Sequence, residues 1–500
     1  MSAAPGFELG HHLPALQVVV PLIGAVICAM LRNGTLAWGW ALIVSVLTAA
    51  ISTMLFVAVQ AGGTISYGLG GWAPPYGIEY RVDLLSAFIL LIVSWAGAII
   101  MVYARQSVMH EIDAGKRAWY YCMYLLCLTG LLGIAITGDA FNAFVFMEVS
   151  SLSMYTLIAM GKNRRALLSS YQYLIMGTIG ATFYVIGVGI LFTLTGSLNF
   201  VDIAERLVTM QMERPAIAAI TFLTVGISLK LALFPLHSWL PNAYAYAPSV
   251  TTSFLAGTAT KVAIYLLMRI FFSTFGEAKV FEILPTTTIL VLLSVSAMIG
   301  ASLVAVFQDD VKRVLAYSSV AQVGYITLGI ALANDLGLTS ALVHIFNHAL
   351  MKTALFLAVG AVFLRIGSVR LHDLDGIGPK MPVTMAAFAL AGFALIGTPG
   401  TAGFVSKYYL AAAVIDKGWW GLVFVIAASS LIAVFYVGRL LEAIWFRAPG
   451  ALAQKASDPP LSMLLPIVGL SLAVIWFGVD TRLTVDVAHN IATMLLGGVK

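Results

Sequence analysis

The feature that most constrains this chain is a series of long apolar segments separated by short polar loops. A helix needs about 20 apolar residues to cross the hydrocarbon of a bilayer, and the sequence divides into fourteen candidate spans. They cover residues 13–31, 35–60, 83–104, 118–137, 140–160, 169–195, 215–236, 244–273, 283–307, 314–333, 339–365, 381–415, 418–446 and 461–479. Backbone groups surrounded by lipid must be paired within their own segment, which favours helices. The sequence therefore predicts an all-α polytopic membrane protein.

Composition supports this fold class and excludes several others. Hydrophobic residues make up 61% of the 500 residues and charged residues only 10%, whereas a soluble domain carries about a quarter charged residues. The three cysteines, Cys28, Cys122 and Cys127, form no CxxC pair, so iron-sulfur, c-type haem and disulfide frameworks lack support. The sequence contains neither a Walker A motif nor a dinucleotide-binding glycine fingerprint. We therefore expect no cofactor and no metal.

The basic residues are distributed unevenly between alternate loops. The richer loops contain Arg32, Arg105, Lys116, Arg117, Lys162, Arg164, Arg165, Lys312, Arg313, Arg365, Arg370, Lys380, Arg439, Arg447 and Lys455. The poorer loops contain Arg81, Arg206, Arg214, Arg269, Lys279, Lys417, Arg482 and Lys500. This scatter indicates membrane topology rather than nucleic-acid binding, and it places the richer side in the cytoplasm and both termini outside a bacterial inner membrane. Residues 1–12 lack the basic start of a signal peptide, so we expect the first span to remain in the mature chain.

Four lysines and one glutamate lie well within predicted spans, namely Lys230, Lys261, Lys352, Lys407 and Glu148. A charge at mid-bilayer costs about 2.5–3.5 kcal/mol on insertion scales, so such residues face the bundle interior or a wet cavity. One interpretation is that these lysines extend to the interface, which is most plausible for Lys352. The other is a proton relay, favoured because lysines and a carboxylate recur near the middle of separate helices. We expect Glu148 to pair with Lys230 and to tune the proton affinity of that lysine.

Two of these lysines lie beside helix breakers. In "SLKLALFPLHSWLP" Pro235 follows Lys230, and in "LIGTPGTAGFVSKYY" Pro399 precedes Lys407. Proline removes a backbone donor and kinks a helix, and discontinuous spans at matching places in two halves mark transport sites, although proline is also common in membrane helices. The matching breaks predict two inverted five-helix repeats. The expected domains are an N-terminal three-helix segment at 1–117, repeats at 118–273 and 282–447, and a C-terminal helix and tail at 448–500.

Two histidines and a lysine share one face of a predicted helix. In "ALVHIFNHALMKTALFLAVG" a spacing of four separates His344, His348 and Lys352. Because histidine titrates near neutrality, a proton relay is favoured over interhelical hydrogen bonds alone. A metal site is disfavoured because no third ligand is evident and Lys352 would repel a cation. His237 and Lys352 are candidates for the point where protons enter, and a helix-capping role for His237 is equally open.

Five stretches in a fixed order resemble a known family. They are "FMEVSSLSMY", "LKLALFPLHSWLPNAYAYAPSVTTSFLAGTATKVAIY", "DDVKRVLAYSSVAQVGY", "HIFNHALMKTALFLAVG" and "GTPGTAGFVSKYY". Together they resemble the antiporter-like subunits shared by complex I and the Mrp-type multisubunit cation/proton antiporters, over about residues 80–450. The resemblance implies fourteen helices, two inverted repeats and a central hydrophilic axis. It assigns relay roles to Glu148, Lys230, Lys261 and Lys407, and places His344 and His348 on the connecting helix.

Within this family the resemblance favours the D-type antiporter subunit. Lys407 stands where M-type complex I subunits usually carry glutamate and agrees with D-type and N-type subunits, while "LGGWAPPYGIEYRVDLLSAF" looks like a D-type loop and third helix. The implied function is exchange of Na+ for H+ in a bilayer, with other membrane subunits as partners. The alternatives are an N- or M-like proton-pumping subunit of an NADH:quinone oxidoreductase or related hydrogenase, and a scaffold with a vestigial relay. No Na+ cage is evident, because Asp83 and Asp139 are expected to be interfacial carboxylates.

Overall fold

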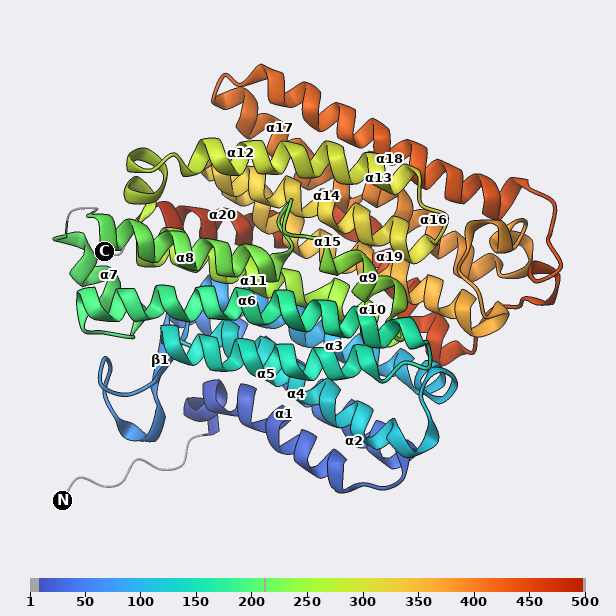
Figure 1. Ribbon diagram of the computed structural model, residues 1–500, viewed down its shortest axis with the longest axis horizontal. Helices are drawn as coiled ribbons and strands as arrows, with labels where there is room; N and C mark the ends of the chain where they lie inside the picture. The colour runs from blue at the N-terminus through green and yellow to red at the C-terminus, as the bar shows by residue number, and fades with distance from the viewer. Residues whose placement is uncertain (1–8, 211–212, 498–500) are drawn as a thin grey trace.

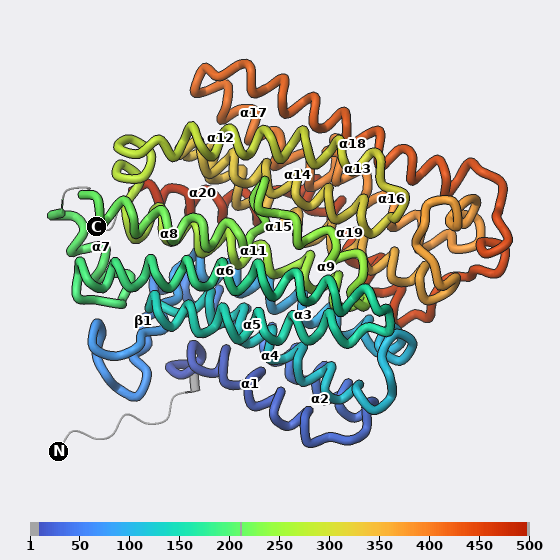
Figure 2. Tube along the Cα trace, in the orientation of Figure 1, coloured from blue at the N-terminus to red at the C-terminus, as the bar shows by residue number. Residues whose placement is uncertain are grey.

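The structure, a computed structural model, describes residues 9–210 and 213–497, and most of them are helical (Figure 1). The long helices lie side by side along the longest axis of the molecule (Figures 1 and 2). Within the described residues the only sheet is a hairpin at one end of the bundle, in which β1 (Ile65–Gly68) pairs antiparallel with β2 (Glu79–Val82). The fold class is therefore the one that the apolar segments predicted.

The helices of the N-terminal part and first half follow one another with short connections. They are α1 (Leu13–Met30), α2 (Gly34–Gly62), α3 (Leu84–Glu111), α4 (Arg117–Ile136), α5 (Ala140–Ala159), α6 (Arg164–Thr195), α7 (Phe200–Val208), α8 (Arg214–Leu231), α9 (Trp239–Tyr246), α10 (Ser249–Phe254) and α11 (Thr260–Met268). A π-helical turn, Leu255–Ala259, joins α10 to α11, and another, Arg269–Thr274, continues α11. These two turns keep residues 249–274 one continuous helical span.

The second half begins after residue 283. Its helices are α12 (Thr286–Ser296), α13 (Ser302–Val306), α14 (Val311–Leu332), α15 (Asp335–Ile366), α16 (Pro382–Ile396), α17 (Ala402–Asp416), α18 (Trp420–Phe446), α19 (Leu461–Val479) and α20 (Arg482–Leu496). The π-helical turn Ala297–Ala301 joins α12 to α13. The centre of the bundle is α15, which packs against α3, α10, α14, α16, α17, α19 and α20.

Thirteen helical segments in the described part of the chain are long and apolar enough to cross a membrane. They correspond to all the predicted spans but one. The exception, 381–415, is split near Pro399 into α16 and α17, each shorter than a membrane crossing, so the predicted count of fourteen spans is not confirmed. Hydropathy also missed α7 and α20, which are short and bury apolar residues on one face only.

Polar side chains fix where several helices begin. Asn33, Asn163, Asn199 and Asn334 each accept a hydrogen bond from a backbone N–H of the first turn that follows, which satisfies donors that a helix leaves unpaired. At the outside of the bundle, α1, α2, α5, α6, α12 and α18 expose apolar side chains. Those faces suit lipid or other membrane subunits.

Candidate functional site

Lys230 lies where the seventh predicted span is broken. It is in the last turn of α8, which ends at Leu231, and Ala232 then takes a left-handed conformation with φ of 59°. The chain becomes helical again at Trp239, whose indole N–H donates to the Leu229 carbonyl oxygen at 2.9 Å. The break therefore leaves Lys230, only 8% exposed, beside the negative end of the α8 dipole.

The structure brings Lys230 together with Glu148 of α5. The Lys230 Nζ lies 3.7 Å from Glu148 Oε1 and donates to Ser151 Oγ at 2.6 Å. Glu148 Oε1 is buried without a hydrogen-bond partner, although the glutamate side chain as a whole is 27% exposed. The predicted pairing is thus present as a loose ion pair rather than a tight one. Such a pair can separate without breaking several hydrogen bonds.

A close approach of helices holds this pair in place. A Cβ added to Gly177 of α6 would lie 1.8 Å from the Tyr155 hydroxyl and 3.5 Å from Lys230 Nζ. The Tyr155 ring packs edge-on against Tyr173 at 4.8 Å between centroids, and its hydroxyl has no hydrogen-bond partner. Glycine is therefore needed at residue 177, because any side chain would displace the tyrosine from the Lys230 site.

Lys261 is fully buried at the start of α11, directly after a π-helical turn. Its Nζ donates to the Ala256 carbonyl oxygen within that turn and lies 3.4 Å from Thr260 Oγ1. π-helical turns interrupt the regular ladder and are frequent at functional sites. A cavity of about 30 Å³ separates Lys230 and Ser151 from Ala259 and Ala263 on this helix. That volume is enough for water between the two lysine-bearing helices.

The two histidines of α15 have different surroundings although they share one face, as predicted. His344 Nε2 lies 2.8 Å from Gln322 Oε1 of α14, and His344 Nδ1 lies 2.7 Å from Ser406 Oγ of α17. The His348 ring stacks parallel to His344 at 6.1 Å between centroids, and neither of its nitrogens has a hydrogen-bond partner. His344 therefore bridges three helices, whereas the buried ring of His348 has two nitrogens that are available for hydrogen bonds or for a proton.

Lys352 is fully buried and does not extend to the interface, so that interpretation is wrong. Its Nζ donates to the Leu315 carbonyl oxygen at 2.8 Å and to Ser318 Oγ at 2.5 Å, both on α14. The sequence shows that Lys352 lies near the middle of its helix, but not that α14 places acceptors beside it.

Lys407 occupies the second break. Its Nζ donates to the carbonyl oxygens of Ile396 at 2.7 Å and Leu395 at 3.3 Å, and to Ser430 Oγ at 3.0 Å. Ile396 ends α16, so these carbonyls are ones that the helix cannot pair itself. The Tyr325 ring lies 4.6 Å from the ammonium and adds a cation–π contact.

The two breaks mirror one another. Lys230 precedes its break on a helix that runs toward it, whereas Lys407 follows its break on a helix that runs away from it. Each ammonium donates hydrogen bonds to hydroxyl or carbonyl oxygens inside the bundle. A buried lysine satisfied by neutral acceptors can gain or lose a proton with little rearrangement of its neighbours.

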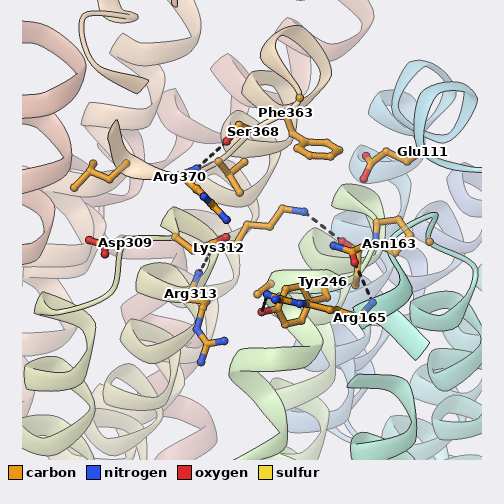
Figure 3. A pocket seen from close by; sticks show the side chains of 18 of the residues that line it. Glu111, Asn163, Arg165, Tyr246, Asp309, Lys312, Arg313, Phe363, Ser368 and Arg370 are labelled. Atoms are coloured by element: carbon orange, nitrogen blue, oxygen red, sulfur yellow. Dashed lines mark hydrogen bonds between the residues drawn. The ribbon is translucent and has the colours of Figure 1, made fainter. Parts of the chain in front are cut away.

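A large cavity, of about 1000 Å³, lies at the end of the bundle where the richer basic loops gather (Figure 3). Lys312 is 3% exposed in this wall and donates to the Ala247 carbonyl oxygen at 3.2 Å and to Ser249 Oγ at 3.3 Å. Asp309 near this wall is exposed and pairs with Arg439 at 2.7 Å, whereas Lys312 is buried. Burial raises the pKa of the Asp310 carboxyl, an effect that the backbone N–H of Arg313 partly offsets.

His237 and Lys352, the residues predicted for proton uptake, do not line this cavity. His237 is half-buried, stacks on Phe234 at 5.1 Å between centroids, and its Nδ1 lacks a hydrogen-bond partner. A second cavity, of about 180 Å³, lies at the opposite end and is lined by residues of the poorer loops, including Arg81 and Arg269. The predicted division of loops between two ends of the bundle is therefore correct.

Comparison with known proteins agrees with this architecture. The family described as NADH:quinone oxidoreductase/Mrp antiporter, TM, matches residues 137–433. The N subunit of the NADH-quinone oxidoreductase of Desulforudis audaxviator is 39% identical over 93% of this chain and 95% of its own. The D-type subunit of the Na(+)/H(+) antiporter of Alkalihalophilus pseudofirmus is 28% identical over 97% of both chains. A chain in the structure of the Mrp complex from Dietzia sp. superposes with a TM-score of 0.90 at 26% identity, over 98% of both chains.

Proposed function

Because the chain belongs to the NADH:quinone oxidoreductase/Mrp antiporter transmembrane family, we propose that it is the D-type membrane subunit of a multisubunit cation/proton antiporter. It is a transporter subunit rather than an enzyme, and other membrane subunits are its partners. It carries H+ across the bacterial inner membrane, with Na+ as the exchanged cation. The basic side of the bundle faces the cytoplasm, and both termini face outward.

The observation that carries this proposal is the placement of buried lysines at two mirrored helix breaks. In the proposed relay, protons pass from the Glu148–Lys230 pair through Lys261 to His348 and His344, and from there to Lys407. The cavity beside Lys230 has room for the water that the first transfer needs. The stacked histidines lie on α15, which packs against α10 of the first half and α17 of the second. When Glu148 approaches Lys230, the charged lysine is stabilised; when the pair separates, burial favours release of the proton.

The mirrored breaks also support the repeat boundaries. In each proposed repeat, 118–273 and 282–447, the fourth span is the discontinuous one, formed by α8 and α9 in the first and by α16 and α17 in the second. Residues 1–117 then add three helices before the repeats, and residues 448–500 add α19 and α20 after them. An odd number of spans per repeat inverts the second copy relative to the first.

A second function is favoured by a specific observation. The identity of 39% with an N subunit of NADH-quinone oxidoreductase exceeds the 28% with a D-type subunit of the Na(+)/H(+) antiporter. An N-like subunit of a redox-driven proton pump would use the same relay, and its redox centres would lie in other chains. The backbone, however, superposes on a chain of the Mrp complex with a TM-score of 0.90, which favours the antiporter. Purification of the native complex separates the two, since flavin and iron-sulfur absorbance would indicate the redox pump and cofactor-free partners the antiporter.

Substitution of the first pair tests the relay. Glu148→Gln removes the carboxylate charge and Lys230→Ala removes the proton carrier, so each should reduce Na+-driven proton movement in membrane vesicles to background while the complex still assembles. Glu205→Gln and Lys116→Ala, at exposed positions outside the spans, are the matched controls and should transport normally. Normal transport by either Glu148→Gln or Lys230→Ala would exclude this relay.

A further inference from the structure

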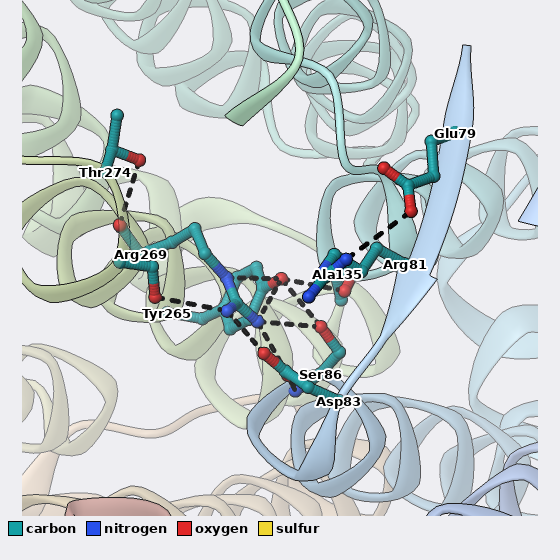
Figure 4. Close-up of polar contacts among 9 residues, drawn as sticks. Glu79, Arg81, Asp83, Ser86, Ala135, Tyr265, Arg269 and Thr274 are labelled. Atoms are coloured by element: carbon teal, nitrogen blue, oxygen red, sulfur yellow. Dashed lines mark hydrogen bonds and ion pairs between the residues drawn. The ribbon is translucent and has the colours of Figure 1, made fainter. Parts of the chain in front are cut away.

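A buried ion pair at the end of the bundle opposite the large cavity is unused by the proposed relay. Arg269, 9% exposed, lies where α11 continues into its π-helical turn, and Asp83, 6% exposed, caps α3. Two parallel bonds join them, from Nη1 to Oδ2 at 2.5 Å and from Nη2 to Oδ1 at 2.7 Å (Figure 4). Asp83 therefore lies at the end of its helix, as expected, but it is buried in an ion pair.

Neighbouring hydroxyl groups extend the pair into a network across three helices. Arg269 Nη2 also donates to Ser86 Oγ at 3.0 Å and to the Tyr265 hydroxyl at 3.3 Å. The Tyr265 hydroxyl in turn donates to the Ala135 carbonyl oxygen of α4 at 2.9 Å. The network thus closes the space between α3, α4 and α11 (Figure 4).

This network lies between a cavity and a relay lysine. On one side is the cavity of about 180 Å³, lined by Asp83, Arg269 and Thr137 and bordered by Leu495 of α20. On the other side, Lys261 precedes Tyr265 by four residues and Arg269 by eight, so the three start from one face of the same helix. The pair and the tyrosine therefore separate the cavity from the segment that holds Lys261.

Two other arginines at this end have acidic partners of their own. Arg81 in the same cavity wall lies 3.6 Å from Glu79, and Arg206 on α7 pairs with Asp202 at 3.0 Å. A buried ion pair is often no more stabilising than apolar residues of the same volume, whereas loss of one partner leaves a costly unpaired charge. Such a pair therefore adds little to the packing of the helices. It is suited to an element that alternates between a paired and a separated state.

We propose that Asp83 and Arg269, with Tyr265 and Ser86, form the gate that closes the first repeat toward this cavity. The proposal rests on the proposed function, in which Lys261 carries a proton. The structure shows the closed state. When the two side chains separate, water passes Tyr265 and reaches the segment that holds Lys261, and the proton passes from the Lys261 ammonium to that water, leaving a neutral amine and hydronium. Asp83 and Arg269 both remain charged throughout.

Cysteine labelling of the assembled complex tests the gate. Ala135→Cys places a thiol behind the network, at a fully buried position, and Val201→Cys places one in the cavity wall. A charged, membrane-impermeant thiol reagent is applied from each side of the membrane in turn. Val201→Cys should react in every background, whereas Ala135→Cys should stay unreactive until Asp83→Asn is added. The native cysteines are buried and provide the baseline.

In the Asp83→Asn background we expect Ala135→Cys to react about tenfold faster, which corresponds to about 1.4 kcal/mol of lost preference for the closed state. Na+-driven proton movement should fall as the gate stays open. If Asp83→Asn prevents assembly, Ser86→Ala removes one acceptor of Arg269 and should give a smaller acceleration. Asp202→Asn breaks an exposed pair at the same end and should change neither readout.

Unchanged labelling of Ala135→Cys in both Asp83→Asn and Ser86→Ala, with the complex assembled, would overturn the gate and leave a static link between helices. Labelling does not depend on transport, so the test is independent of the relay. If Lys261→Ala transports normally, the proposed function fails while the labelling result still decides whether the pair controls access of water.

Discussion

At the scale of single residues, each buried lysine is bound by oxygen atoms that the fold leaves available. Lys407 takes the last carbonyls of α16, and Lys261 takes a carbonyl from a π-helical turn. Lys352 uses a backbone carbonyl and Ser318 of α14, and Lys230 uses Ser151 and the carboxylate of Glu148. Burial of a charge is costly unless it is paired or hydrogen-bonded. Hydroxyl and carbonyl oxygens thus bind all four lysines, and a carboxylate lies beside only Lys230.

The two histidines should respond differently to the same substitution. His348→Leu removes a ring with no hydrogen-bond partner, so we expect no loss of stability, but loss of proton movement if the ring carries protons. His344→Leu leaves Gln322 and Ser406 without their partner and should lower the free energy of unfolding by about 1–3 kcal/mol. Thermal unfolding of the detergent-solubilised complex and transport in vesicles measure both effects.

Equal destabilisation by the two histidine substitutions would show that His348 has partners of its own in the native membrane. Normal transport by a stable His348→Leu complex would remove this residue from the relay. His344→Asn offers a check, because a side chain that still donates and accepts should recover part of the stability.

At the scale of elements, the break between α16 and α17 depends on glycine. Gly397 has φ of 91°, a conformation that side chains rarely adopt. At Gly403 an added Cβ would lie 1.8 Å from the Ala394 carbonyl oxygen. The two half-helices can therefore pack against each other, and place Lys407 on the α16 carbonyls, only because residue 403 lacks a side chain.

Gly403→Ala should separate α16 from α17 and remove Lys407 from its acceptors, because a backbone atom cannot move aside as a flexible side chain can. We expect less assembled complex and background transport, measured by quantitative blotting and by vesicle assays. Gly438→Ala on α18 is the matched control, since nothing lies within 4 Å of the added Cβ. Assembly of Gly403→Ala at the level of the control would contradict this view of the break.

The sequence alone was sufficient to predict the features that depend on the residues of one helix. Hydropathy located the spans, prolines located the breaks, and the rarity of intramembrane charge located Glu148, Lys230, Lys261 and Lys407. It was insufficient where the partner comes from a distant helix. Asp83 reads as a helix-start carboxylate, and only the fold shows Arg269, 186 residues later, against it. Lys352 likewise lies against acceptors that α14 supplies.

At the scale of the whole molecule, the bundle has a cavity at each end and a polar centre between them. The large cavity lies among the basic loops at one end, and the Asp83–Arg269 pair lines the smaller cavity at the other end. The buried lysines lie in the helices between the two cavities. The apolar faces of α1, α5, α6 and α18 surround this polar interior. The two matching breaks give the halves an equivalent lysine each, so a relay through both halves requires both lysines.

The most direct test of this account is Na+-driven proton movement by the assembled complex with Lys407→Ala, followed with a pH-sensitive dye in everted membrane vesicles. Lys407 lies at the second break, where its ammonium contacts Ile396 and Ser430, and it is the proton carrier that the proposed relay places there. We predict that the dye response to Na+ falls to background while the amount of complex is unchanged. An unimpaired response would contradict the relay and leave the chain as a scaffold for its partner subunits.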